Sequence, residues 1–262
     1  MIKKLMKYDI RNMTKILVYF YAIGIIAAVL TRLINIGDHI QFIMIIGKIF
    51  EGITYAAIAN IIINTFMHII LKSFINNFYK DESYLTHTLP VTKKQLLISK
   101  YLSSLIVVLI SVVVSVASLF IVLYSKEFIE GLKAFISLTV SGFNMSSGEF
   151  ITLVVLILFT QVNAMISMSF TAIVKANTYN TKRVIKGLLW FAVYYFGSGM
   201  ITLLLAVVTF AIGGNISELT ATQMSQSSFT TLFILALVAN IIYTAVHCLV
   251  SYKLFNKGVN VD

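Results

Sequence analysis

Hydrophobic residues in this chain form long runs separated by short polar segments. A helix needs about 20 apolar residues to cross the hydrocarbon core of a bilayer. Six runs meet this length, and they cover residues 16–33, 41–71, 101–124, 150–174, 187–212 and 229–252. The pattern predicts an all-α integral membrane protein with six transmembrane helices, built as a single transmembrane domain over residues 1–262.

The N-terminal segment, about residues 2–14, is predicted to form an amphipathic helix on the inner membrane surface. Its apolar residues recur at near-helical spacing among lysines: Ile2, Leu5, Met6, Met13 and Ile16. The alternative is a frayed basic tail. A basic start before an apolar run is also typical of signal peptides, but this run is span-length and has no evident small-residue cleavage site, so we expect it to be retained.

Three other segments carry expectations of their own. As one helix, residues 41–80 would be about 60 Å long, twice the thickness of the hydrocarbon core, so part of it should project into the cytoplasm. Segment 126–148 should form a short outer interfacial helix, because apolar residues recur at helical spacing between its charges. Segment 213–228 is rich in Ser, Thr and Gln and should be a plain loop.

Composition supports a membrane protein. Hydrophobic residues make up 59% of the 262 residues and charged residues only 11%, whereas a soluble domain has roughly a quarter of its residues charged. The single proline suits long unbroken helices, because proline breaks helical hydrogen bonding. The single cysteine, Cys248, lies in an apolar run, which favours a packed thiol.

The basic residues are distributed unevenly between the two sides. Lys48, Lys126, Lys133 and Arg32 fall on one side, and the remaining sixteen of the 20 Lys and Arg residues fall on the other, with both termini. Because cytoplasmic loops carry the excess of Lys and Arg, both termini are predicted to be cytoplasmic. The same placement explains the net charge of +10 by contact with anionic lipid, and no nucleic-acid partner is expected.

Motifs for catalysis or for binding a metal or cofactor are absent from the sequence. There is no G-x-x-x-x-G-K-[ST], H-E-x-x-H or G-x-S-x-G, and the four histidines lack metal-ligand spacing. The triplet Gly197-Ser198-Gly199 is typical of helix packing. An enzyme is therefore not expected.

Polar residues inside the spans are candidates for a translocation path. Asn60, Asn64 and His68 step by four along the second span, with Lys72 one turn further, and Asn240, Thr244 and His247 share a face of the sixth. The alternative is that such residues, with Gln161, Asn163 and Ser167 of the fourth span, only form the hydrogen bonds that hold the bundle together. Few charges lie deep in the spans, which argues against an ion-coupled transporter, and Lys48 and Glu51 can pair across one turn.

The connection between the second and third spans, residues 79–100, contains the only proline, Pro90. Thr92 and Gln95 have capping-box spacing, so a helix should begin at Thr92, expose Lys93 and Lys94 and lead into the third span. This arrangement favours docking on a cytoplasmic partner. The alternative is a hairpin that lies on the membrane.

The run D-E-S-Y-L-T-H-T-L-P-V-T-K-K-Q-L-L-I-S-K, residues 81–100, resembles the cytoplasmic loop of small permease subunits of type-two ABC exporters from low-GC Gram-positive bacteria. The opening Lys7-Tyr8-Asp9 is similar as well. The resemblance implies that the loop helix couples the spans to a separately encoded ATPase, which would bind ATP and Mg while this chain binds no cofactor. By position, the coupling residues would be Asp81, Glu82, Pro90, Thr92, Lys93, Lys94 and Gln95.

The resemblance also implies a multi-pass protein of the bacterial plasma membrane that pairs with a second permease copy or a related subunit. Unlike the sterol and lipid branch of the family, the chain has no large outer domain between its fifth and sixth spans. An apolar interior favours export of an amphipathic peptide, toxin or antibiotic. The alternative function is a sensory or immunity protein that only scaffolds an ATPase.

Overall fold

The computed structural model describes residues 2–36, 41–70, 75, 88, 90–142, 145–179, 181–213, 217 and 225–257. These residues form helices joined by short connections, and they include no β-strand. Six of the helices in this part of the chain are long and apolar enough to span a membrane, which confirms the six predicted runs. The chain is a multi-pass α-helical membrane protein. It divides into two compact units, Met1–Ile129 with Val261–Asp262, and Glu130–Asn260.

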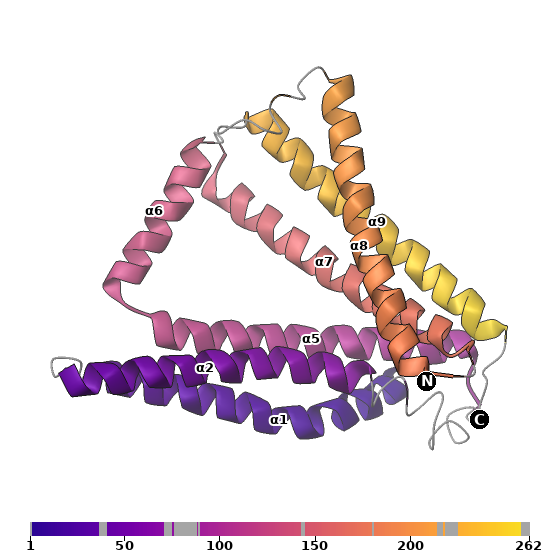
Figure 1. Cartoon of the computed structure of the whole chain (residues 1–262), viewed down its shortest axis with the longest axis horizontal. Helices are drawn as coiled ribbons and strands as arrows, with labels where there is room; N and C mark the ends of the chain where they lie inside the picture. Colours follow the sequence, from indigo (N-terminus) through magenta and orange to yellow (C-terminus); the bar gives the residue numbers. More distant parts are fainter. Residues whose placement is uncertain are drawn as a thin grey trace. The chain divides into compact units, whose positions relative to one another are not determined.

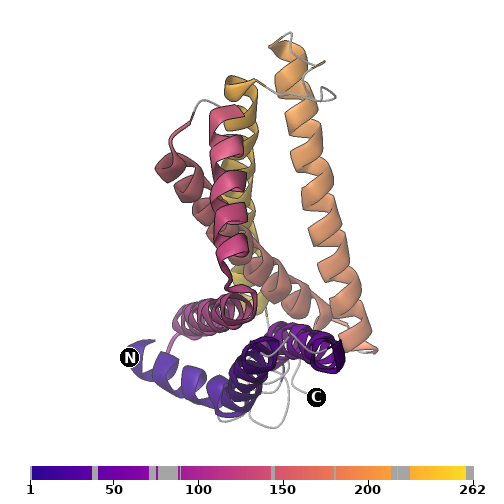
Figure 2. The same ribbon diagram turned by 90° about the vertical axis from the view of Figure 1, so that its left-hand side faces the viewer.

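The first unit is a bundle of three long helices. They are α1 (Ile2–Asn35), α2 (Gln41–Met67) and α5 (Lys93–Leu123). The three run side by side in Figure 1, and Figure 2 views them nearly end-on. α1 packs against both of the others, and α2 continues beyond Met67 through a π-helical turn at residues 68–70.

α1 differs from the prediction in one respect. The N-terminal segment is helical, as expected, but it is continuous with the first span in a single helix of 34 residues. At about 1.5 Å per residue, this helix is about 51 Å long, well beyond the thickness of about 30 Å of a hydrocarbon core. No proline or glycine lies between Ile2 and Ile23. Nothing in this part of the sequence therefore interrupts the helical hydrogen bonds where the charged N-terminal segment meets the apolar span.

α5 begins where the capping box predicted, with Thr92 as the N-cap residue. The helix is not a separate short element, however, because it runs without a break from Lys93 through the whole third span to Leu123. Neither glycine nor proline occurs in these 31 residues. The predicted docking segment is therefore the first turns of the transmembrane helix itself.

Hydroxyl groups join the three helices of the first unit. The Ser111 hydroxyl of α5 lies 2.6 Å from the Tyr21 hydroxyl of α1 and 2.7 Å from the Thr65 hydroxyl of α2. Near the C-terminal end of α1, the hydroxyls of Thr31 in α1 and Thr54 in α2 lie 2.8 Å apart. Lipid tails are as apolar as leucine, so burial of apolar surface does not favour helix association in a membrane, and close packing with hydrogen bonds takes its place.

Gly24 lies at a close contact between these helices. A Cβ atom at this position would lie 2.6 Å from Cδ1 of Ile61 in α2 and 3.9 Å from the Ser118 hydroxyl of α5. Ile61 is fully buried. The missing side chain therefore lets α1, α2 and α5 pack tightly at one level.

The second unit contains α7 (Ser147–Ala176), α8 (Arg183–Ile212) and α9 (Gln226–Asn256). α7 packs against both α8 and α9, and its C-terminal half, from Ala164 onward, supplies most of the buried residues. Tyr243 of α9 joins α8 by donating a hydrogen bond of 3.0 Å to the Ser198 carbonyl.

α6 (Lys126–Gly142) confirms a helix in the segment predicted for an outer interfacial helix, and none of its residues is buried. The predicted loop 213–228 is shorter than expected, because α9 already begins at Gln226 with Ser225 as its N-cap.

Replacing Gly24 with leucine should destabilise the first unit, because the new side chain must displace the fully buried Ile61. Overpacking of this kind costs about 1–3 kcal/mol. We expect the Gly24→Leu variant to melt several degrees below the wild type in mild detergent. Gly52→Leu is the matched control, since no atom lies within 4 Å of a Cβ at Gly52. Equal melting temperatures for the two variants would contradict the tight packing at Gly24.

Candidate functional site

The start of α5 has the geometry of a complete capping box. The backbone N–H of Gln95 donates to the Thr92 hydroxyl at 3.2 Å, and the backbone N–H of Thr92 donates to the Gln95 side-chain carbonyl at 3.1 Å. Two backbone N–H groups that have no partner within the helix are satisfied in this way. The capping box predicted for these two residues is confirmed.

Three of the other predicted coupling residues, Pro90, Lys93 and Lys94, lie next to this cap. Pro90 and Lys94 are exposed and Lys93 is half-buried, whereas Leu96 and Leu97 of the next turn are buried. Asp81 and Glu82 lie outside the described residues. The first turn of α5 thus presents polar side chains at the surface while its apolar side chains anchor it in the bundle.

A buried ion pair ties this part of α5 to the N-terminal part of α1. Lys100 donates to one carboxylate oxygen of Asp9, and the Ser99 hydroxyl donates to the other at 3.1 Å. The side chains of Lys100 and Asp9 are only 4% and 11% exposed. Because a buried charge without a partner is costly, the two helices are held together at this level.

This ion pair was missed in the sequence, where Lys100 counted only as one of the cytoplasmic cations. A signal was present, because Asp9 is the first acidic residue of the chain and the next is Asp38. A lone acid in a basic amphipathic helix points to a specific partner. The sequence gives no indication of which lysine that partner is.

The polar residues of the second span lie along α2 on a face that the bundle leaves accessible. Asn60 is exposed, and Asn64 and His68 are half-buried. Each bonds the helix's own backbone one turn earlier: Asn60 Nδ2 donates to the Ala56 carbonyl at 2.9 Å and Asn64 Nδ2 to the Asn60 carbonyl at 2.9 Å, and His68 Nδ1 lies 2.8 Å from the Asn64 carbonyl. The structure therefore brings the three together as one stripe, while Lys72 lies outside the described residues.

The buried positions of α2 form a different face, with Thr54, Ile58, Ile61 and Thr65 among them. Asn60, Asn64 and His68 are not among these fully buried positions.

The polar residues of the sixth span are packed differently. Asn240 is buried at 8% exposure, and Thr244 donates to its carbonyl at 2.8 Å. The His247 carbonyl accepts a bond of 2.9 Å from Thr171 of α7, and its ring meets Tyr194 of α8 edge-on. These contacts hold α7, α8 and α9 together. They therefore favour the alternative that the polar residues of this span stabilise the helix bundle. The stripes of α2 and α9 belong to different units.

The polar residues of the fourth span mostly bond their own helix. Asn163 Nδ2 donates to the Phe159 carbonyl at 2.7 Å, and the buried Ser167 hydroxyl donates to the Ala164 carbonyl at 2.8 Å. Gln161 is half-buried. Asn163, Ser167 and Thr171 step by four along α7, but Ser167 and Thr171 are buried, unlike the stripe of α2.

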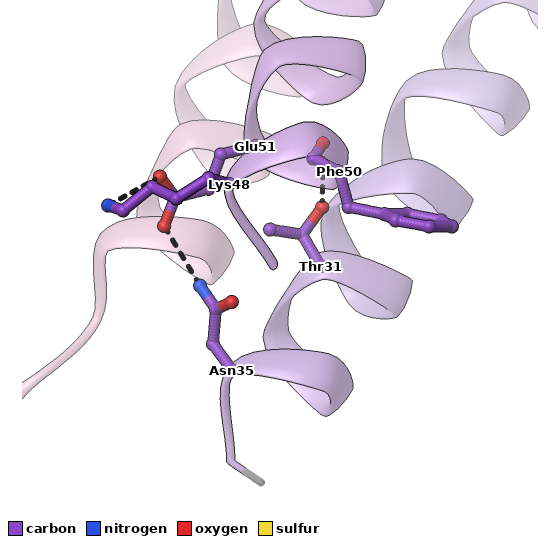
Figure 3. A network of polar contacts seen from close by, with 5 residues as sticks. All are labelled: Thr31, Asn35, Lys48, Phe50 and Glu51. Atoms are coloured by element: carbon purple, nitrogen blue, oxygen red, sulfur yellow. Dashed lines mark hydrogen bonds and ion pairs between the residues drawn. The ribbon is translucent and has the colours of Figure 1, made fainter. Parts of the chain in front are cut away.

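The predicted pair of Lys48 and Glu51 is present at the start of α2, with 3.1 Å between Nζ and Oε2 (Figure 3). Glu51 also accepts a hydrogen bond of 3.0 Å from Asn35, the last residue of α1. A Cβ at Gly47 would lie 2.4 Å from the Asn35 side-chain oxygen, so this glycine makes room for the contact. The network joins the end of α1 to the start of α2.

Within the described ranges, no group of three or more His, Cys, Asp or Glu residues lies close enough to hold a metal ion. No protein-family model, curated protein or solved structure matches this chain.

Replacing Asp9 with asparagine should destabilise the first unit, because it removes the carboxylate that pairs with the buried Lys100 ammonium. Breaking a buried pair from one side typically costs about 3–5 kcal/mol. Lys100→Met should be damaging for the converse reason, whereas the double variant Asp9→Asn/Lys100→Met removes both charges and should recover much of the loss. Thermal unfolding of all four proteins in mild detergent gives the coupling energy. Purely additive losses would contradict the ion pair.

Proposed function

We propose that this chain is the membrane-spanning permease subunit of an ATP-driven ABC exporter in the bacterial plasma membrane. The observation that carries the proposal is the continuity of α5, in which a capped, surface-exposed first turn and a transmembrane span form one rod. A force applied at Lys93 and Lys94 is transmitted along such a rod without a hinge. Because Lys100 is bound to Asp9, α1 would follow the same movement.

In this proposal ATP hydrolysis takes place in a separate cytoplasmic ATPase, which binds ATP and Mg. The sequence of this chain has no phosphate-binding loop, and the resemblance of residues 81–100 to exporter coupling loops supports docking at this point. Thr92 and Gln95 would give the docking surface its shape, since together they fix the first turn of the helix.

The accessible stripe of Asn60, Asn64 and His68 is the best candidate for the wall of a translocation path. Polar side chains on a membrane helix are costly against lipid and usually face a bundle interior or a water-filled cavity. In the permease this stripe would face a shared cavity or a second copy of the chain. The residues around His247 already hold their own unit together and are weaker candidates for such a path.

The substrate class that fits this path is an amphipathic peptide, toxin or peptide antibiotic. The path would offer amide groups and an imidazole group among apolar side chains, and none of its three residues is an acid, a lysine or an arginine. A protein that only scaffolds an ATPase as a sensor would share the topology. Directional peptide transport in vesicles distinguishes the two.

Altering the first turn of α5 should uncouple the permease from its ATPase. We expect Pro90→Ala or the double variant Lys93→Ala/Lys94→Ala to lower permease-stimulated ATP turnover by about tenfold, equivalent to about 1.4 kcal/mol of coupling, while the protein stays inserted. The measurement is ATPase activity of the complex recovered by mild-detergent pull-down from the native host.

The matched control is Lys126→Ala/Lys133→Ala, which removes the same charge from α6. Recovery of no ATPase with the wild-type chain would refute the exporter assignment. Full stimulation by the α5 variants would refute the coupling role of this turn while leaving the assignment open.

The proposed orientation has its own test, because Cys248 is the only cysteine of the chain. In a Cys248→Ala background, a cysteine placed at Lys133 should react with a membrane-impermeant maleimide in intact cells. A cysteine placed at Lys182 should react only after the cells are permeabilised, since the excess of Lys and Arg lies on its side. The reverse labelling pattern would show that the orientation in the membrane is opposite to the predicted one.

A further inference from the structure

Apolar and charged side chains lie on opposite sides of α6. Residues three or four positions apart share a face of a helix. One face carries apolar side chains and one threonine: Phe128, Leu132, Phe135, Ile136 and Thr139. The opposite face carries all the charges of the helix and two of its serines: Lys126, Glu127, Glu130, Lys133, Ser137 and Ser141. This separation is typical of a helix that lies between water and an apolar medium.

The apolar face of α6 is open. Leu132 is 43% exposed and Phe135 is 64% exposed, and no residue of this helix is buried. A surface helix of a globular domain would bury such a face against its neighbours. A contiguous apolar face that stays exposed marks an interaction surface.

The beginning of α6 is attached to the end of a membrane span. α5 ends at Leu123 with Tyr124 as its C-cap. The Ser125 hydroxyl then accepts a hydrogen bond of 3.0 Å from the backbone N–H of Phe128. The Phe128 ring meets Phe120 of α5 edge-on, with 6.3 Å between the ring centres. The first turn of α6 therefore lies where α5 leaves the hydrocarbon core, at the level that aromatic side chains favour.

The other end of α6 is attached to the beginning of the next span. The Met145 backbone N–H donates to the Val140 carbonyl, in the last turn of α6, at 3.1 Å. α7 begins two residues later, at Ser147. Glu149, in the first turn of α7, is exposed and forms a capping box with Ser146. A carboxylate is costly inside hydrocarbon, so this first turn lies at the membrane surface.

The two attachments determine how α6 runs relative to the membrane. α6 is not one of the six spans found among the described residues, so both of its ends lie on the same side of the membrane. Its 17 residues make a helix about 26 Å long. An upright α6 would carry its last turn about that far from the surface. The bond from Met145 instead holds this turn within about 10 Å of the first residue of α7. The axis of α6 therefore follows the membrane surface.

The apolar surface of α6 continues that of a span. Val116, Phe120 and Leu123, in the last turns of α5, are exposed apolar residues of a membrane-spanning helix. Phe120 and Phe128 are in ring contact, so this surface passes from α5 to α6 without a gap. Lipid, which surrounds the spans, is therefore the occupant that fits the apolar face of α6.

We propose that α6 binds the lipid surface at the end of α5, with its axis in the headgroup plane and Leu132, Phe135 and Ile136 between the acyl chains. The charged face is turned toward water. α6 contains two lysines and two glutamates, so the contact depends on apolar insertion and not on anionic headgroups. In the proposed orientation this surface is the outer leaflet. The contact does not depend on transport activity.

Fluorescent labels on opposite faces of α6 test this proposal in the full-length protein. In a Cys248→Ala background, Phe135→Cys and Ser137→Cys form a matched pair, because both positions are exposed and they lie on opposite faces. Each protein is labelled with bimane and reconstituted in phosphatidylcholine vesicles with iodide available on both sides. We expect the label at position 135 to show blue-shifted emission, quenching by brominated lipid and protection from iodide. The label at position 137 should show the opposite pattern.

Two further measurements test which interaction holds α6 to the membrane. Leu132→Glu should make the label at position 135 accessible to iodide, whereas Glu130→Gln, on the charged face, should leave it protected. Adding phosphatidylglycerol should not change the quenching at either position.

Four results would overturn the proposal. Iodide quenching at both positions would place α6 in water. Protection of position 135 from both quenchers would show that protein covers the apolar face, as in a contact with a second copy of the chain. Unchanged protection in the Leu132→Glu variant would show that the apolar face does not hold the helix in lipid. Insertion that requires phosphatidylglycerol would show that charge, and not the apolar face, drives the contact.

Discussion

A carboxylate and an ammonium group enclosed between two mainly apolar helices must stay together, because either charge alone would be buried without compensation. Asp9 and Lys100 are in this position, and Ser99 satisfies the second carboxylate oxygen. The pair lies between the N-terminal part of α1 and the first turns of α5, the level at which a cytoplasmic partner would act. At this level, α1 and α5 therefore cannot separate without exposing one of the two charges or leaving it unpaired.

Directed bonds hold α5 to α1 at a second level as well. Tyr21 and Ser111 share a hydrogen bond eleven residues beyond Lys100, which is about 16 Å along the helix. Two attachment points fix the direction of a rod as well as its position, so α1 and α5 should move as one body. Between and beyond these points the interface relies on small residues such as Gly24, and the buried hydroxyls of Ser103 and Ser118 have no hydrogen-bond partner in the part of the chain described.

The extent to which the sequence predicted this structure follows from the range of the interactions involved. The six spans follow from local hydrophobicity, and the capping box at Thr92 and the pair of Lys48 with Glu51 follow from spacings of three residues, so all of these were predicted and are confirmed. The pairing of Asp9 with Lys100 joins residues 91 positions apart, and no local pattern encodes it. The continuity of α1 was missed for another reason: a change in the polarity of a helix face does not interrupt the backbone.

Pairing between residues that are distant in sequence also affects the charge pattern from which the membrane orientation is predicted. A count of Lys and Arg treats every cation alike, yet Lys100 is buried and paired with Asp9, whereas Lys175 and Lys186 lie over the aromatic rings of Trp190 and Tyr179. Lys and Arg side chains near a membrane surface interact with its anionic lipids. Leaving Lys100 out of the count changes sixteen residues against four to fifteen against four. The predicted orientation therefore depends on the remaining cations, and four of them lie between residues 175 and 186.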